Sequence, residues 1–101
     1  MPSNPGERGI LILTSLAGGD KHGYALMQDI ESFAGLRLGP GTLYGALARM
    51  EEDKLVSALP ADARRRPYRI TKRGREILEH ELSQNAKVAK VGLRRLSGTG
   101  R

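Results

Sequence analysis

A mainly α fold with one small β-hairpin, and so an α+β class, is predicted by two patterns in this sequence of 101 residues. Apolar residues recur at helical spacing in four segments. Between the third and the fourth stand two short segments that alternate apolar and polar residues, joined by a turn-like sequence with three consecutive arginines. Because a chain of this length forms one modest core, we expect a single small domain.

The first two helices are expected at residues 7–16 and 22–33. Closely spaced aliphatic residues fill the first, and Gly18 and Gly19 end it. The expected core residues of the second helix are Tyr24, Leu26, Met27, Ile30 and Phe33. For Met27 and Phe33 the alternative is an effector pocket in a dimer.

The third helix is expected at residues 40–53, and its first turn is slim and polar. Pro40 presets the backbone φ, and Thr42 is predicted to cap the free N–H groups. An apolar stripe is formed by Leu43, Leu47 and Met50. The residues off this stripe suit the DNA major groove, and we assign Gly41, Thr42, Tyr44 and Arg49 to DNA binding. An ordinary amphipathic helix after a loop is the alternative.

A β-hairpin is expected next, from strands at residues 55–59 and 67–71. Three helices followed by a hairpin form a winged helix-turn-helix, in which the hairpin loop, or wing, reaches the DNA backbone or minor groove beside the third helix. We therefore add Arg64, Arg65, Arg66 and Arg69 to the predicted DNA contacts. A solvated loop is the alternative, since charge runs are often just that.

Positive charge is concentrated in this hairpin region. Residues 1–59 carry five basic and seven acidic side chains, a balance of −2. Residues 60–75 carry seven basic and one acidic, or +6, and residues 76–101 carry five basic and three acidic, or +2. Clustered positive charge favours a polyanionic partner, because each phosphate that it neutralises releases counterions.

The last helix is expected at residues 71–97, with Thr71 as its N-cap. About 25 helical residues span roughly 37 Å, more than so small a domain can cover. The second half of this helix should therefore project and pair with a second copy of the chain. The spacing of the apolar residues on this helix is close to that of a coiled-coil seam. The predicted dimerisation residues are Leu78, Leu82, Ala86, Ala89, Leu93 and Leu96.

Other classes of protein lack support in the sequence. The chain has no Cys, no apolar run long enough to span a membrane and a polar N-terminus, so we expect a cytoplasmic protein without disulfides. No nucleophile stands with a base, and His22 and His80 lack companions at metal-ligand spacing. We expect no catalysis, cofactor or metal, and we interpret His22 as a helix-entry residue whose ring bonds a nearby backbone group.

Three motifs resemble those of the PadR-type winged-helix regulators, over roughly residues 10–82. They are His22-Gly23-Tyr24; Gly41-Thr42-Leu43-Tyr44 with its continuation to Val56; and Arg66-Pro67-Tyr68-Arg69-Ile70-Thr71, followed by Gly74. The resemblance implies a homodimeric repressor that binds a palindromic operator, dimerises through its C-terminal helix and responds to a small-molecule effector.

Two positions depart from the family pattern. Gly45 replaces a proline, which implies a looser third helix. Lys54 stands where the family places glycine, so we expect either a different helix exit or a strained lysine.

The predicted organisation is a winged-helix DNA-binding domain at residues 7–75, continuous with a C-terminal dimerisation helix at residues 71–97. The predicted partners are double-stranded DNA, a second copy of the chain and a small-molecule effector, with no membrane. A winged helix used for protein–protein contact and a ligand sensor with secondary DNA binding remain the alternatives.

Overall fold

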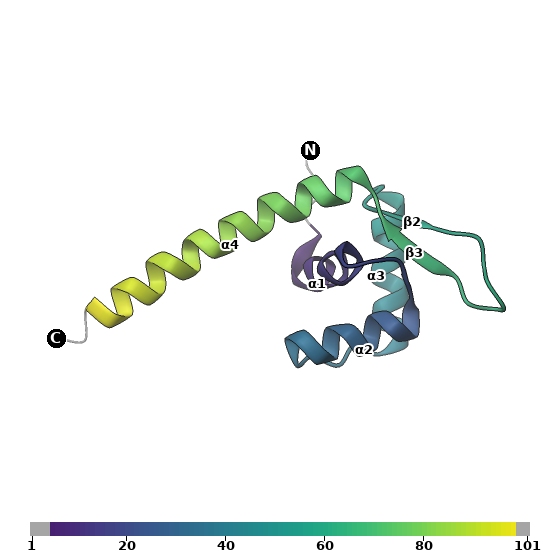
Figure 1. The fold of residues 1–101 in the computed structure, drawn as a ribbon, viewed down its shortest axis with the longest axis horizontal. Helices are drawn as coiled ribbons and strands as arrows, with labels where there is room; N and C mark the ends of the chain where they lie inside the picture. Colours follow the sequence, from purple (N-terminus) through teal and green to yellow (C-terminus); the bar gives the residue numbers. More distant parts are fainter. Residues whose placement is uncertain (1–4, 99–101) are drawn as a thin grey trace.

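The computed structural model describes residues 5–98, and its element order follows the expected one with a single addition (Figure 1). Four helices and three strands make up the described part, and their bounds are α1 Gly6–Ala17, β1 Lys21–His22, α2 Gly23–Ala34, α3 Pro40–Glu52, β2 Val56–Ala58, β3 Pro67–Ile70 and α4 Lys72–Gly98. The mainly α fold with a small hairpin is confirmed.

The added element is β1, which the sequence analysis missed. This strand of two residues pairs antiparallel with β3, so that Lys21 lies opposite Tyr68, and the sheet has the order β1-β3-β2. On the other side of β3, Val56 pairs with Ile70 and Ala58 with Tyr68. Two residues cannot display a strand period, so no alternating pattern indicates β1.

The core lies between the first three helices and the sheet. Its fully buried side chains come from every one of these elements or from their junctions: Ile12, Leu13, Leu16, Leu26, Ile30, Leu43, Leu47, Leu55 and Val56. On β3, Tyr68 and Ile70 share one face and are buried, whereas Arg69 between them is exposed.

Two core assignments on α2 were wrong. Tyr24 is 62% exposed and Phe33 is 46% exposed, whereas Leu26 and Ile30 are fully buried. The apolar residues of α2 extend around the helix beyond the strip that its neighbours cover. Phe33 instead lines a groove beside α4, together with Leu11 and Leu82.

Helix α4 begins against the hairpin and then leaves the domain, as expected from its length (Figure 1). Thr71 caps it, because the Gly74 N–H donates to Thr71 Oγ1 at 3.0 Å. The same hydroxyl donates to the Lys54 carbonyl at 2.7 Å. The described residues therefore form a molecule with extents of 59 × 30 × 21 Å, of which α4 is the projecting arm.

Gly74 permits this close start of α4. A Cβ at Gly74 would overlap the Leu55 carbonyl oxygen and would lie 3.0 Å from Ile70 Cγ1. The same carbonyl accepts the Thr71 N–H at 3.1 Å. The backbone of α4 can therefore approach the strand only where no side chain stands between them.

Candidate nucleic-acid interface

Helix α3 presents a narrow outer face. Its apolar stripe is buried through Leu43, Ala46, Leu47 and Met50. On the opposite side, Gly41, Gly45 and Ala48 are exposed, and they lie close to one line because they are four and three residues apart. No bulky side chain rises from this line, so the α3 backbone can approach a groove closely.

Polar side chains lie on the two edges of this face. Thr42 and Arg49 are seven residues apart and share one edge. Tyr44 and Glu51 have the same spacing and share the other edge. All four are exposed. This arrangement leaves the centre of α3 free for close approach and places hydrogen-bonding groups on both sides of it.

Thr42 does not cap α3, contrary to the sequence prediction. Gly39 is the N-cap residue, no side chain caps the helix, and the Leu43 N–H donates to the Gly39 carbonyl at 2.9 Å. The helix begins at Pro40, three residues earlier than a Thr42 cap would require, because proline favours the first turn. The Thr42 hydroxyl is thus left available on the exposed edge.

Tyr44 packs across the start of α2. Its side chain is 48% exposed, and its hydroxyl occupies the space that a Cβ on Gly23 would need. Gly23 therefore determines where the Tyr44 hydroxyl lies. Burial raises the pKa of the neighbouring Tyr68 hydroxyl above its ordinary value, and the Glu51 carboxylate adds to that rise. The edge that carries Tyr44 and Glu51 accordingly faces the sheet.

The wing ends in a tight two-residue turn with the arginines at its tip. The Asp62 N–H donates to the Arg65 carbonyl at 2.6 Å, and the Arg65 N–H donates back to Asp62 at 2.9 Å. Ala63 and Arg64 occupy the turn with φ of +48° and +75°. Hairpin turns with two positive φ values usually contain glycine or asparagine. The backbone is therefore strained at Ala63 and Arg64, which form the tip of the wing.

The predicted wing arginines are in different situations. Arg64 and Arg66 are exposed and form no ion pair with any other described residue. Arg65 lies with its Nη1 atom 3.1 Å from the Nε2 atom of His22. The His22 ring thus supports the wing rather than bonding a backbone group, which corrects the sequence interpretation.

Arg69, the fourth hairpin arginine among the predicted DNA contacts, is exposed and pairs with Asp20, and its contact with DNA stays a prediction. Its guanidinium donates to both carboxylate oxygens of Asp20, with Nη2 at 2.8 Å from Oδ2 and Nε at 3.1 Å from Oδ1. This contact lowers the pKa of the Asp20 carboxyl below its ordinary value, chiefly through the hydrogen bond. Arg69 therefore fastens the segment before β1 to β3. The partners are 49 residues apart, so no local pattern in the sequence indicates their contact.

Lys54 has a φ of +62°, which confirms the strained lysine as one of the two expected outcomes. It follows the end of α3 directly, and its carbonyl accepts the Thr71 hydroxyl. The turn into β2 is short as a result, and β2 packs against α3. The hairpin therefore begins beside α3 and projects away from the helices (Figure 1).

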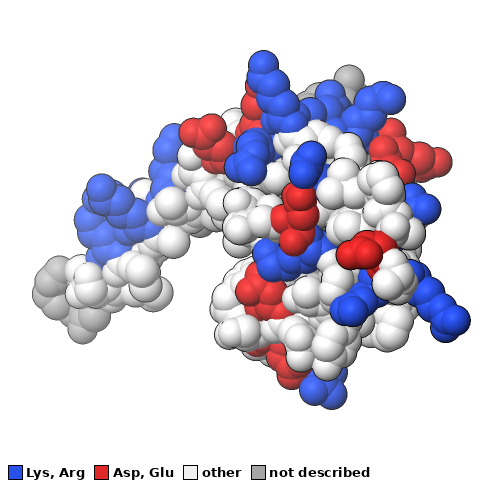
Figure 2. Space-filling model, turned by 45° about the vertical axis from the view of Figure 1, so that its right-hand side comes forward, with Lys and Arg blue, Asp and Glu red and all other residues white. Residues whose placement is uncertain are grey.

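The predicted dimerisation residues fall into two groups. Leu78 is only 6% exposed and packs in the core of its own domain, so we remove it from the predicted seam. The other five, Leu82, Ala86, Ala89, Leu93 and Leu96, are exposed, and Leu93 and Leu96 are 68% and 73% exposed. Figure 2 shows basic side chains gathered on the same projecting arm, where α4 carries Lys87, Lys90, Arg94 and Arg95.

The described part of the chain contains neither a metal-binding cluster nor a membrane-spanning helix. Among residues 5–98, no three His, Cys, Asp or Glu side chains gather in a way that would hold a metal ion. No helix in the same span is both long enough and apolar enough to cross a bilayer.

Three packed helices, a small antiparallel sheet with a projecting loop and a long final helix together define a winged-helix protein. The chain belongs to the PadR-like family of transcriptional regulators, whose family model matches residues 12–80.

Solved structures of this family share the fold. The chain is similar to a PadR family transcription regulator from Clostridium difficile R20291, with a TM-score of 0.77 and 28% identity over 86% of this chain and 95% of that one. It is also similar to a PadR-like regulator from Bacillus cereus, with a TM-score of 0.74 and 25% identity over 91% of each chain.

A longer relative also contains a matching region. The chain is 49% identical over 80 residues to the "uncharacterized 37.1 kDa protein in transposon TN4556" of Streptomyces fradiae. The match covers 79% of this chain and 23% of that protein, so the chain spans less than a quarter of its relative's length.

Proposed function

We propose that this protein is a sequence-specific regulator that binds a palindromic operator as a homodimer, with α3 in the major groove and the wing on the adjacent backbone. The observation that carries the proposal is the form of α3. Its outer face is made of small residues, with Thr42 and Arg49 on one edge and Tyr44 on the other. A narrow helix front flanked by hydrogen-bonding groups fits a groove that admits one helix.

The wing supplies the sequence-independent part of binding. Arg64 and Arg66 are exposed, unpaired with other described residues and placed at the end of the hairpin. Guanidinium groups held in this way suit phosphate oxygens, which match their hydrogen-bonding fork. Phosphate contacts position the protein, whereas the α3 edges select the bases.

The wing is tested by replacing Arg64 and Arg66 with glutamine and measuring binding to random duplex DNA over a range of salt. The log–log salt slope should fall by about 0.9 for every phosphate contact removed, and so by about 1.8 per protomer. The matched control replaces Lys90 and Arg94, which removes the same charge from the far half of α4. A wing variant that retains the wild-type slope would contradict the assignment.

The exposed apolar residues on α4 support the proposed homodimer. Leu82, Leu93 and Leu96 are 41–73% exposed, although a small domain gains stability by burying such side chains. A symmetric pair of α4 helices would bury the seam of both copies and would place two recognition helices about one DNA turn, ~34 Å, apart.

The dimer is tested with two matched substitutions on α4. Leu93→Asp places a charge in the proposed seam and should yield monomers in sedimentation experiments. Val88→Asp is the control, because Val88 is as exposed as Leu93, at 69%, but lies five residues away and hence about 140° around the helix. Dissociation by Val88→Asp alone would place the interface on another face.

Repression and relief by a small-molecule effector complete the proposal, and the family resemblance supports them rather than any group of side chains. Operator binding measured with and without small aromatic compounds tests the effector. A reporter gene placed behind the operator tests the sign of regulation.

A further inference from the structure

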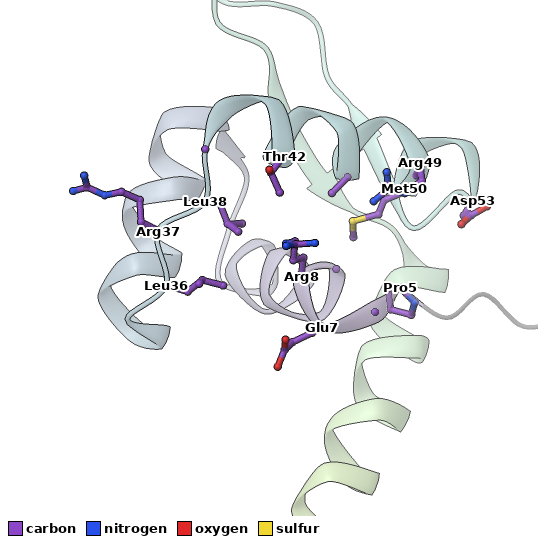
Figure 3. Close-up of a pocket in the computed structure, with 14 residues that line it drawn as sticks. Pro5, Glu7, Arg8, Leu36, Arg37, Leu38, Thr42, Arg49, Met50 and Asp53 are labelled. Atoms are coloured by element: carbon purple, nitrogen blue, oxygen red, sulfur yellow. The ribbon is translucent and has the colours of Figure 1, made fainter.

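A cleft of about 610 Å³ lies between the start of α1, the connection from α2 to α3, and α3 itself (Figure 3). Each of these three segments contributes one arginine to its lining. Arg8 comes from α1, Arg37 from the connection and Arg49 from α3. The walls of this cleft are far apart along the chain, so no local pattern in the sequence indicates it.

Arg8 and Arg49 line the cleft from two different helices, α1 and α3. Figure 3 shows Arg8 projecting from α1 toward α3, where Thr42 and Arg49 lie, whereas Glu7 points away from α3. Within residues 5–98, neither Arg8 nor Arg49 makes an ion pair or a side-chain hydrogen bond. Asp53 also lines the cleft, at the end of α3, without pairing with either arginine.

Two like charges directed into one hollow repel each other unless an anion lies between them. A phosphate group accepts several N–H donors at once and matches the planar fork of a guanidinium. The Thr42 hydroxyl adds a further donor to the same wall. Arg37 lies at the rim, and its contact with Glu31, at 3.3 Å, joins exposed groups and is readily exchanged for a stronger partner.

The cleft and the wing flank α3 on opposite edges. Tyr44 lies on the edge that packs against Gly23, directly after β1 of the sheet from which the wing projects. Thr42 and Arg49 lie on the edge toward α1 and line the cleft. Two phosphate backbones border the DNA major groove. A helix inserted in that groove with basic groups on only one of its edges would contact only one of these two backbones.

We propose that Arg8, together with Arg49 and Thr42, binds a phosphate group in this cleft, and that the phosphate belongs to the DNA strand opposite the one that the wing contacts. This inference rests on the proposed DNA-binding function, and it assigns α1 a part in that function. The phosphate chemistry is the same for a free phosphorylated ligand, which the experiment below separates from a DNA strand.

The experiment compares Arg8→Gln with Arg94→Gln, which removes an equal charge from the distant half of α4. Both positions are exposed, so both variants are expected to fold. Binding to random duplex DNA is measured over a range of salt. We expect Arg8→Gln to lower the log–log slope by about 0.9 per bound protomer, with Arg94→Gln unchanged and Arg8→Lys restoring most of the slope.

A second arm titrates inorganic phosphate into the DNA-free protein at constant ionic strength and follows the amide signals of the residues that line the cleft. If the slope of Arg8→Gln is unchanged but phosphate shifts these signals in the wild type and not in Arg8→Gln, the cleft binds free phosphate and the strand assignment is wrong. If neither arm responds to Arg8→Gln, the whole inference is overturned. A wild-type protein that fails to bind duplex DNA contradicts the proposed function instead, and the phosphate titration still tests the cleft.

Discussion

Replacing Gly74 with alanine should destabilise the protein although it introduces a better helix former. The new Cβ would overlap the Leu55 carbonyl oxygen and lie 3.0 Å from Ile70 Cγ1. Leu55 is fully buried, and its carbonyl belongs to the backbone, so it cannot rotate away as a side-chain end can. The start of α4 must therefore move away from the junction between α3 and β2.

The size of this effect follows from three contributions. Overpacking against buried backbone costs about 3 kcal/mol, the upper part of the usual range. Separation of α4 from Leu55 also weakens the bond that the Thr71 N–H donates at 3.1 Å, which is worth about 1 kcal/mol. The higher helix propensity of alanine offsets this loss of stability by up to about 1 kcal/mol. We expect a net loss of about 3 kcal/mol, or about 10–25 °C in Tm.

The assay is thermal and urea unfolding without DNA at one protein concentration, because the stability of a dimer depends on concentration. Gly45→Ala is the matched control, since a Cβ at that helical position meets nothing within 4 Å. It should stabilise the protein by up to about 1 kcal/mol. If Gly74→Ala proves as stable as Gly45→Ala, the described packing of α4 on Leu55 is wrong.

Three further substitutions test other features. Gly23→Ala should displace the half-exposed Tyr44 side chain, so operator affinity should fall while urea unfolding changes little; unchanged affinity would exclude a DNA role for this tyrosine. Lys54→Gly should raise stability by about 1 kcal/mol, because it relieves the strain of a positive φ, and no gain in thermal unfolding would show that this turn is unstrained. Asp20 has a folded pKa below its unfolded value, so its ionised form stabilises the fold at neutral pH and this stabilisation disappears as pH falls below about 4. Wild type and Asp20→Asn should therefore converge in stability at acid pH, and a constant difference between their unfolding curves would contradict the ion pair's role.

Local patterns were sufficient to predict most of the fold. The stripe of Leu43, Leu47 and Met50 identified the buried side of α3, and all three are buried. The Thr71 cap and the strained Lys54 were also predictable, because each depends on neighbouring residues and on the family pattern. These features require no knowledge of distant contacts.

The wrong assignments depended on contacts that the sequence does not display. The His22 ring bonds the side chain of Arg65, 43 residues away, rather than a nearby backbone group. Leu78 has the spacing of a seam residue, but its place on α4 falls where the helix still covers its own domain. Apolar periodicity identifies which face of a helix is buried, but it does not identify the element that buries it.

The sequence predicted which helix and which hairpin form the candidate site, but it predicted the individual residues of the site less completely. The α3 residues and the free wing arginines lie in exposed positions, as a DNA-contact role requires, although contact itself stays a prediction. Arg8 gave no signal, because a lone arginine in a polar first turn is ordinary. Only the fold places it opposite Arg49 across a cleft.

The central claim is that the outer face of α3 and the wing bind one DNA duplex together. Titration of ¹⁵N-labelled protein with duplex DNA, followed through the backbone amide shifts, tests it most directly. We predict that the largest shifts fall within residues 40–52 and 60–67, with the far half of α4 almost unaffected. Shifts concentrated on α4, with α3 and the hairpin loop unchanged, would contradict the account.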